Sequence, residues 1–513
     1  MTNATKELPT DLAAAHFVIN ELTLKNDELQ QQVNWFKRQL FGEKSEKSRG
    51  EEQLPMEQLW LGGKAPETSA VPVPSATVKE HVRKQCGKQA LEDDCGESGL
   101  RFDSTVPVEV IPCPPAEIAG LEPEQYEVIG TKFTERLCQR PGSYFVKRYE
   151  RPVVKIKETQ KVINAPAPES VFERSYAEVS LLAGIMVDKF QYHIPLFRQH
   201  SRMSANGIKI ARGNLTSWVH RAATLLMPVY QAVLQSALES QVLALDESPL
   251  KVGQEKPGKL HRGYMWVMYG DKDEAVFLYS ATRAMIAVQE LLKKFCGTIV
   301  TDGYTVYEKL AASYENIEHA LCWAHTRREF YEAKDYEPQR CNKALDYIGR
   351  VYKAESEIKE RGLSGDEKLN YRITHALQVT DEFFAWLKQE QLSNALLPSN
   401  KFHKAAAYAL KREAGLRIFL SDPQVPLDTN HLERQIRPLP LGRKNWLFCW
   451  TEVGAHAVAV IQTLISCCKL HGADPFEYFL DVLPRLDRHP VNRVAELTPR
   501  QWAKARNAKA LAE

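Results

Sequence analysis

Residues 428–448 have the sequence DTNHLERQIRPLPLGRKNWLF. Asp428 or Thr429 can cap a helix at its first turn, because both side chains accept hydrogen bonds from free backbone N–H groups. Leu432 and Ile436 lie four residues apart and give that helix one apolar face. The segment therefore predicts a short helix that packs against a core and holds its polar side chains in fixed directions.

Glu433 lies one helical turn before Arg437, at the start of a cluster of positive charge, and Pro438 is expected to stop the helix. One interpretation of Glu433 is a surface ion pair contributing about 0.3–0.5 kcal/mol. The alternative rests on its neighbours, since cations interleaved with aromatic rings suit phosphates and exposed bases. These neighbours are Arg434, Arg437, Arg443, Lys444, Trp446, Phe448 and Trp450. The alternative predicts a metal-dependent site that acts on nucleic acid.

Two further acids end short apolar runs upstream. Asp246 follows the run VLAL and Asp302 follows the run TIVT, so each is expected at the end of a buried strand. An acid there is costly unless it is hydrogen-bonded or holds a cation. Either aspartate alone is explained by a turn or a helix cap. Together with Glu433, they predict a carboxylate metal site.

Four segments resemble the insertion sequence 66 family of bacterial transposases in residue type, order and spacing. They are LALDESPLKV (243–252), TDGYTVY (301–307), CWAHTRREF (322–330) and the 428–448 segment. The resemblance extends over nearly the whole chain, from an N-terminal zipper to a C-terminal helical element. It implies a transposase with an Asp-Asp-Glu catalytic domain.

The resemblance implies that Asp246, Asp302 and Glu433 are the catalytic and metal-binding residues. Thr429 departs from the family pattern, which usually has the middle Asn of Asp-Asn-Asn at this position. The departure affects a hydrogen bond at the start of the helix and no catalytic group.

Carboxylate oxygens suit Mg²⁺ or Mn²⁺, and the preference for Mg²⁺ follows from the family resemblance. We predict two Mg²⁺ ions about 3.5–4 Å apart, for which Mn²⁺ can substitute. One ion would activate a water or a DNA 3′-hydroxyl, and the other would stabilise the leaving oxygen. Cations near the acids are predicted to hold DNA phosphates, which adds affinity but little sequence choice. They are Arg327, Arg328, Arg434, Arg437, Arg443 and Lys444.

The motif CWAH suggests half of a zinc site through Cys322 and His325. A zinc site needs four ligands, and no partner pair is evident, so a packing and hydrogen-bonding role is favoured.

The chain has 513 residues and a formal net charge of +2, so several domains are expected and DNA binding must be argued from local clusters of charge. The start of the sequence lacks a signal-peptide pattern, and the apolar run at 457–468 is too short to span a bilayer. Ten scattered cysteines are typical of reduced thiols. We predict a cytoplasmic protein that is associated with the nucleoid when bound to DNA.

Residues 8–42 show a heptad seam over about four heptads. It consists of Leu12, Ala15, Ile19, Leu22, Asn26, Leu29, Val33, Phe36 and Leu40. Asn26 at a core position favours a parallel two-stranded coiled coil, so a homodimer or higher oligomer is predicted. The alternative is a single amphipathic helix packed on its own domain. Residues 43–82 have the composition of a flexible linker.

Residues 83–168 are predicted to form a small β-rich module with a strand pattern at 144–158. The family commonly has a zinc module here with paired Cys-x-x-Cys motifs. The cysteines in this region never occur two residues apart, so no structural zinc is expected. Its basic side chains either contact DNA or form a solvated strand face.

Residues 169–238 are predicted to be helical, and two of the helices resemble a helix-turn-helix. The side chains that such a motif would offer to a DNA groove are Asn214, Thr216, Ser217, His220 and Arg221. Because short helices joined by turns are common, the alternative is ordinary helix packing.

Residues 239–334 show three strands, a helix and two further strands, the ribonuclease-H-like order in which the first and fourth strands are adjacent. A helical insertion at 335–424, a last core part with Glu433 at 425–455 and a C-terminal helical element at 456–513 follow. The predicted fold class is thus multidomain α/β, with a ribonuclease-H-like core behind an N-terminal coiled coil and small β and helical modules.

These patterns predict the DNA transposase of an insertion sequence, which binds element ends and target DNA and catalyses metal-dependent strand cleavage and strand transfer. Accessory proteins encoded by the same element are further candidate partners, and no membrane is expected. Two alternatives stay open: a catalytically silent DNA-binding or regulatory relative, and a ribonuclease-H-like nuclease that cuts without joining.

Overall fold

The computed structural model describes residues 100–510 apart from 120, 141, 174, 254–258, 284–285, 393–396, 398 and 450. The chain divides into a unit at Met1–Gly96 and a unit at Glu97–Glu513, and the described residues belong to the second. The predicted coiled coil (8–42), the linker (43–82) and the start of the β-rich module lie outside the described residues.

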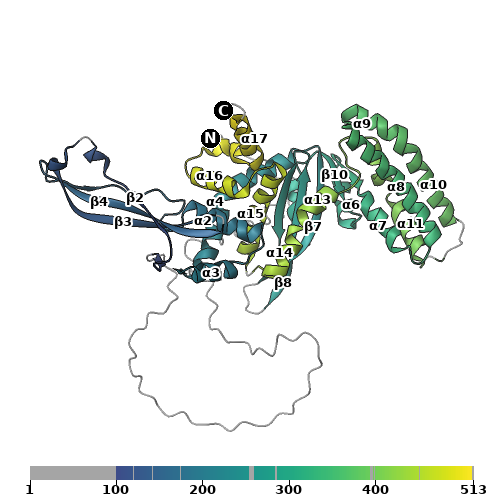
Figure 1. Cartoon of the computed structure of the whole chain (residues 1–513). Helices are drawn as coiled ribbons and strands as arrows, with labels where there is room; N and C mark the ends of the chain where they lie inside the picture. The colour runs from purple at the N-terminus through teal and green to yellow at the C-terminus, as the bar shows by residue number, and fades with distance from the viewer. Residues whose placement is uncertain are drawn as a thin grey trace, which may run out of the picture. The chain divides into compact units, whose positions relative to one another are not determined.

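A small sheet comes first along the described chain. Its order is β2-β4-β3, with β5 paired to β4, and the long strands β3 and β4 form an antiparallel hairpin (Figure 1). The bounds are β2 Val108–Pro112, β3 Tyr126–Arg140, β4 Ser143–Ile156 and β5 Val162–Asn164. A short strand β1 (Arg101–Phe102) pairs with β6 (Ile208–Lys209). The strand predicted at 144–158 is confirmed by β4.

Three helices follow, as the sequence predicted: α2 (Val179–Phe190), α3 (Leu196–Ala205) and α4 (Arg212–Leu238). Asn214 is buried and donates a hydrogen bond to the hydroxyl of Tyr176 at 2.8 Å. The expectation that Asn214 is available to a DNA groove is therefore wrong, because its amide is used inside the fold. Ser217, in contrast, is exposed.

The central sheet has five strands in the order β11-β10-β7-β8-β9. Their bounds are β7 Val242–Gly253, β8 Leu260–Gly270, β9 Glu274–Ser280, β10 Gly297–Thr301 and β11 Ile317–Leu321. β10 runs parallel to both β7 and β11, whereas β8 is antiparallel to β7 and β9. The predicted adjacency of the first and fourth strands of this region is confirmed. The helices α5 (Ile286–Leu292) and α6 (Thr305–Ala312) connect β9 to β10 and β10 to β11.

The C-terminal helices are α15 (Glu452–Leu470), α16 (Pro475–Arg485) and α17 (Pro499–Ala510), with a short 3₁₀ segment at Val491–Leu497. α15 is the one described helix that is long and apolar enough to cross a membrane by composition, and its most apolar window is 72% buried. Its Thr463 hydroxyl accepts a hydrogen bond from the backbone N–H of Phe277 in β9 at 2.9 Å. α15 is therefore accounted for as a core helix that packs on the sheet.

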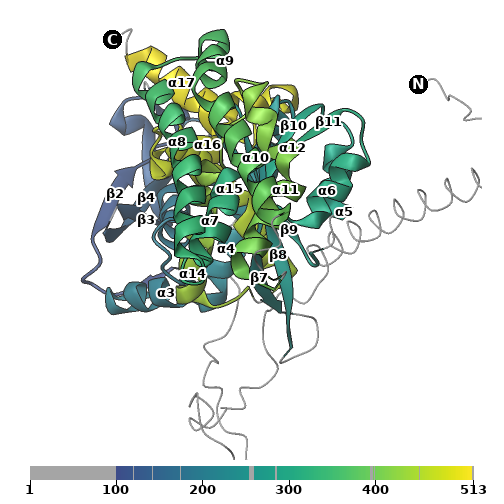
Figure 2. The ribbon, with the colours of Figure 1, turned by 90° about the vertical axis from the view of Figure 1, so that its right-hand side faces the viewer.

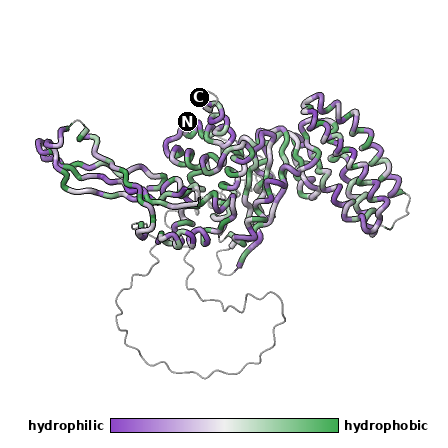
Figure 3. Tube along the Cα trace, viewed as in Figure 1, coloured by the Kyte–Doolittle hydropathy of each residue, from purple (hydrophilic) through white to green (hydrophobic). Residues whose placement is uncertain are grey.

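Between β11 and Glu433 the chain is helical, as predicted. The helix α7 (Trp323–Glu332) comes first, and the segment from α8 to residue 420 is called the insertion below. Its helices are α8 Pro338–Arg361, α9 Gly365–Arg372, the π-helical turn Ile373–Leu377, α10 Gln378–Leu392, α11 Lys401–Lys411, α12 Glu413–Arg417 and the 3₁₀ turn Ile418–Leu420. Figure 2 shows them side by side, and Figure 3 shows hydrophobic and hydrophilic residues alternating along them.

The insertion has its own apolar packing. Aromatic rings fill it, with Phe383 at 5.1 Å from Phe384 and 6.0 Å from Phe330 between ring centroids. Arg372 is fully buried and is bonded to Glu355 at 2.6 and 3.0 Å and to the carbonyl of Phe419 at 2.7 Å. A buried guanidinium with these partners fixes how the helices pack, because losing one partner would leave a buried charge uncompensated.

The segment that opened the sequence analysis forms two helices, α13 (Asn430–Ile436) and α14 (Pro438–Trp446). Thr429 is at the N-cap position of α13 without a capping side-chain bond, and Asp428 just before it accepts at Oδ1 a hydrogen bond from the N–H of Asn430 at 3.0 Å. Pro438 does end α13, but it also begins α14 without a loop. The prediction treated proline only as a stop, whereas its missing N–H costs nothing in the first turn of a helix.

Candidate active site

Asp246 and Asp302 lie on neighbouring parallel strands. β7 and β10 pair through Thr298–Val242, Ile299–Leu243 and Val300–Ala244, so two residues further along both strands the two aspartates stand at the same level. Asp302 directly follows the last residue of β10, as predicted. Asp246 was predicted at a strand end, but β7 continues to Gly253, because its ladder with β8 runs on after its pairing with β10 has ended.

The carboxyl group of Asp246 is held where its negative charge is poorly compensated. Burial raises the pKa of Asp246 to about 7, and the charges of Glu247 and Asp302 act in the same direction. The hydrogen bond from the backbone N–H of Glu247 to Oδ1, at 2.7 Å, and the nearby His325 lower this pKa in part. A carboxyl group whose pKa is raised in this way favours a proton or a cation at the site.

The loop after β10 fixes Asp302. Its Oδ1 accepts a hydrogen bond from the N–H of Tyr304 at 3.0 Å, at the start of α6. The next residue, Gly303, lies so close to the insertion that a Cβ atom there would overlap Arg412 Nε and Tyr408 Oη. The motif TDGY therefore uses its acid to hold the turn that leads into α6 and its glycine to admit side chains from a distant segment.

Glu433 comes to this region on α13, which packs on β7 and β8. Its Oε1 lies 3.9 Å from Nε2 of His325, and His325 also lowers the pKa of Asp246. His325 thus lies near both acids, although the sequence analysis predicted only packing and hydrogen bonding for the CWAH motif. Its position four residues after the end of β11, a strand parallel to β10, is the signal that could have revealed it, since carboxyl ends of parallel strands gather site residues.

The rest of the CWAH motif packs as predicted. Cys322 is buried, and its sulfur accepts hydrogen bonds from both the N–H and the hydroxyl of Thr429, each at 3.3 Å. Trp323 is buried and donates from Nε1 to the carbonyl of Leu416 at 2.8 Å. Thr429, which departs from the family pattern, therefore joins the start of α13 to the end of β11.

The types of side chain at the site suit a divalent metal ion, but the spacing of the described side chains does not form a complete ligand set. Within the described part of the chain, no three His, Cys, Asp or Glu side chains converge closely enough to form a metal site. The carboxylates of Asp246 and Asp302 nevertheless supply the hard oxygen ligands that divalent cations prefer, and the unfavourable charge at Asp246 would be relieved by one. The residues fit a divalent cation by chemistry, with Asp246 and Asp302 as its central pair and Glu433 further out beside His325.

A second acid next to Asp246 has a different role. Glu247, whose side chain is 6% exposed, accepts a 2.5 Å hydrogen bond from the Tyr307 hydroxyl and a 2.9 Å bond from Nε of Arg283. Tyr307 is fully buried on α6, which starts just after Asp302. This network, which sequence analysis missed, joins β7 to α6 and so holds the two aspartate segments in register.

The predicted DNA-binding cations lie on α7, α13 and α14. Five are exposed: Arg327, Arg328, Arg434, Arg437 and Lys444. Arg443 differs, because it is half-buried and its guanidinium donates to the backbone carbonyl of Pro249 in β7. This bond holds α14 to the sheet. Burial also lowers the pKa of Arg443.

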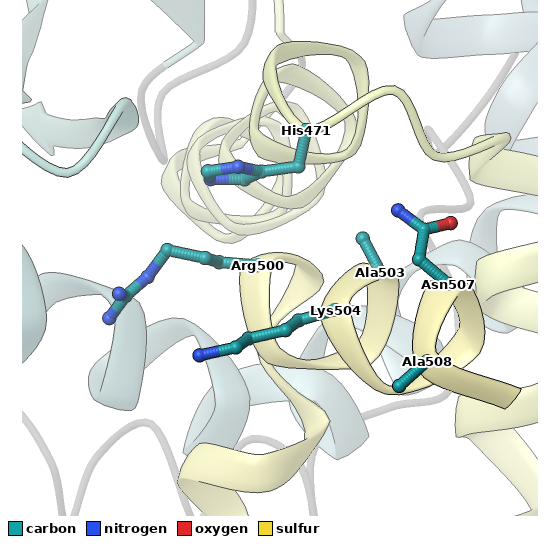
Figure 4. A pocket seen from close by; sticks show the side chains of 6 residues that line it. All are labelled: His471, Arg500, Ala503, Lys504, Asn507 and Ala508. Carbon is teal, nitrogen blue, oxygen red and sulfur yellow. The ribbon is translucent and has the colours of Figure 1, made fainter. Parts of the chain in front are cut away.

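A pocket of about 410 Å³ lies away from these acids, between α17 and the end of α15 (Figure 4). His471, Arg500, Lys504 and Asn507 are among its lining residues. Arg500 is already paired with Glu274 at 2.9 Å. None of the candidate catalytic residues lines this pocket.

Comparison with known proteins matches three parts of the chain. Residues 174–457 match the model of the Transposase IS66 family, residues 463–500 match the IS66 C-terminal element, and residues 28–94 match a model described as Transposase C of IS166 homeodomain. Among curated relatives from Sinorhizobium fredii (strain NBRC 101917 / NGR234), the uncharacterized protein y4hP is 27% identical over 93% of this chain and 89% of its own length. The uncharacterized protein y4jD is 30% identical over 73% of this chain and 76% of its own length.

Proposed function

This chain belongs to the IS66 transposase family, and on that premise we propose that it binds the ends of an insertion sequence and catalyses cleavage and joining of DNA strands through Asp246, Asp302 and Glu433. The observation that carries the proposal is the parallel pairing of β7 and β10, which sets Asp246 beside Asp302. Burial, with the charges of Glu247 and Asp302 adding to it, raises the pKa of the Asp246 carboxyl to about 7.

We propose further that the central sheet is a ribonuclease-H-like core. Three features support this assignment: the antiparallel meander β7-β8-β9, the position of β10 beside β7, and the parallel β11 at the edge. The helical insertion between Asp302 and Glu433 lengthens the chain between the acids without separating α13 from β7.

The acidic residues would hold Mg²⁺, or Mn²⁺ in its place, and we keep the prediction of two ions. Bound divalent cations would make a water or a DNA 3′-hydroxyl a stronger nucleophile and stabilise the charge on the leaving oxygen. Asp246 and Asp302 supply the paired carboxylates. His325 lies beside Glu433, with its Nε2 3.9 Å from Oε1 of that carboxylate.

Exposed cations flank these acids and would bind the DNA backbone. Arg327 and Arg328 come from α7, Arg434 and Arg437 from the end of α13, and Lys444 from α14. Contacts of this kind orient a duplex without reading its sequence. Residues 28–94, which match the model described as Transposase C of IS166 homeodomain, overlap the end of the predicted coiled-coil segment at 8–42, and we propose that this segment forms a dimer.

Two other functions are tested by the same experiment. A silent DNA-binding relative is not favoured, because all three acids are present. A nuclease that cuts without joining has the same site chemistry, and only the fate of the cut strand separates it from a transposase.

The experiment is cleavage and joining of a labelled duplex that carries the end of the flanking element, with any accessory proteins of the element supplied. Wild type is compared with Glu433→Gln and Asp246→Asn in Mg²⁺, Mn²⁺ and EDTA. Joined products that require the metal and vanish in both variants are expected. Cutting without joining would identify a nuclease, and binding without cutting would identify a silent relative.

A further inference from the structure

The insertion contacts both segments that carry the candidate catalytic acids. Arg412, between α11 and α12, reaches the loop after β10, and Tyr352, on α8, reaches Asp428, which lies just before α13. Asp302 and Glu433 are 131 residues apart in the chain, and the insertion occupies most of that interval. These two contacts lie at its two junctions with the site.

The first contact ties the insertion to Asp302. Nη2 of Arg412 donates a 2.6 Å hydrogen bond to the carbonyl of Gly303, the residue after Asp302. The guanidinium stacks on the ring of Tyr408 at 3.8 Å and lies 3.7 Å from Glu308 of α6. The Arg412 side chain is only 10% exposed. Burying a cation is costly, so the guanidinium of Arg412 needs the hydrogen bonds that it makes in the fold. Its charge-assisted bond to the carbonyl of Gly303 therefore holds the loop after β10.

The second contact ties the insertion to Glu433. The hydroxyl of Tyr352 donates a 3.0 Å hydrogen bond to Oδ2 of Asp428. Oδ1 of Asp428 accepts a hydrogen bond from the N–H of Asn430, the first residue of α13, the helix on which Glu433 lies, and Oδ2 also accepts one from the Asn430 side-chain amide at 2.6 Å. Tyr352 therefore ties α8 to the residue that is bonded to the start of α13.

We propose that the insertion is a positioning element for the active site, with Arg412 and Tyr352 as positioning residues that hold Asp302 and Glu433 in register. The proposal rests on the proposed function for its catalytic consequence. Its structural consequence, the ordering of two segments, is independent of activity. Catalytic groups must be held to within about 0.5 Å of their productive geometry, so ties from one helical element to both acid-bearing segments bear directly on the site.

The test compares two positioning variants with two matched controls. Arg412→Gln removes the guanidinium bond to Gly303, and Tyr352→Phe removes only the hydroxyl bonded to Asp428. Arg417→Gln and Tyr371→Phe are the controls, because Arg417 pairs with Asp381 and Glu413 and the Tyr371 hydroxyl bonds to Glu357, all within the insertion. Thermal unfolding first establishes that all four variants fold.

The first readout is hydrogen exchange of the full-length, metal-free protein. Amides at 303–312 are expected to exchange at least about fivefold faster in Arg412→Gln, and amides at 430–446 to do so in Tyr352→Phe, from the loss of one hydrogen bond each. The controls should leave both segments unchanged. Equal exchange in positioning variants and controls would overturn the proposal.

The second readout is strand joining. Each positioning variant is expected to lower the joining rate at saturating DNA by about tenfold, since displacing a reacting group by 1 Å costs about 10²-fold and a lost tether loosens rather than displaces it. The DNA concentration for half-maximal rate should not change. A change in that concentration alone would identify Arg412 and Tyr352 as DNA-binding residues and overturn the positioning role. If wild type fails to cut or join, the proposed function fails, while hydrogen exchange still decides whether the insertion orders the two segments.

Discussion

Replacing Asp246 with asparagine should stabilise the metal-free protein at neutral pH while abolishing activity. The folded protein raises the pKa of this carboxyl from an ordinary 3.8 to about 7. Between these two pH values the folded state keeps a proton that the unfolded state has lost, so the free energy of unfolding falls as pH rises. The penalty is absent below pH 4 and complete above pH 7.

The size of the penalty follows from the shift. About three pH units at 1.36 kcal/mol each give about 4 kcal/mol, and solvent screening of this half-buried group reduces it to about 2–4 kcal/mol. Asparagine removes the charge and still accepts the N–H of Glu247 through its amide oxygen. For a cooperative unit of roughly 400 residues, a gain of 2–4 kcal/mol raises the Tm by about 2–5 °C.

The assay is thermal unfolding of wild type and Asp246→Asn in EDTA at several pH values from 4.5 to 8. The difference in Tm should be smallest at the lowest pH and grow until about pH 7. Added Mg²⁺ should raise the Tm of wild type at pH 8 and that of the variant by less, because a ligand stabilises only the state that binds it. A variant that is no more stable than wild type at pH 8, or whose gain is the same at every pH, would refute the assigned charge penalty.

Three other outcomes are expected. Gly303→Ala should lower the Tm by the equivalent of about 1–3 kcal/mol and reduce joining, because the new methyl overlaps Arg412 and Tyr408. Its control, Gly349→Ala on the open face of α8, should raise stability by about 0.5–1 kcal/mol. Equal Tm values for the two variants would contradict the prediction. Arg437→Ala should lower the slope of log affinity for DNA against log salt concentration by about one unit, with little change in Tm. Arg443→Ala should lower the same slope and also lower the Tm, because it loses the bond to Pro249. An unchanged slope for Arg437→Ala would argue against a phosphate contact. Burial, aided by the charge of Lys189, lowers the pKa of His220 to about 4. The stability that neutral His220 contributes is therefore complete above pH 6.5 and is lost as pH falls toward 4. His220→Asn should flatten this part of the plot of Tm against pH by the equivalent of about 3 kcal/mol, and a variant curve that runs parallel to that of wild type would contradict the prediction.

Much of the central sheet was predictable from the sequence because its signals are local. The apolar runs before Asp246 and Asp302 marked buried strands, and the ribonuclease-H-like order of three strands, a helix and two further strands predicted that β10 lies next to β7. The helices of the insertion were equally clear from their period. The sequence was ambiguous at Pro438, because a proline can end one helix and can equally well begin the next.

The composition of the candidate site was less predictable. His325 lies near Glu433, which is 108 residues away in the sequence, and no periodicity marks such a pair. The same holds for the Tyr307 bond to Glu247 and for Asn214, whose polar side chain suited a DNA groove but is buried against Tyr176. Each depends on how separate elements pack, which residue type alone leaves open.

The sequence by itself determined the family and the order of strands and helices, and it proposed the three candidate acids, because these depend on residue type and on spacing along one segment. Only the tertiary structure decided that β7 runs on past β10, that Asp246 has a charge penalty, and that Arg412 and Tyr352 connect the insertion to both sides of the site. The physical reason is that burial, electrostatic coupling and hydrogen bonds between distant segments arise only when the chain brings them within a few ångströms of each other.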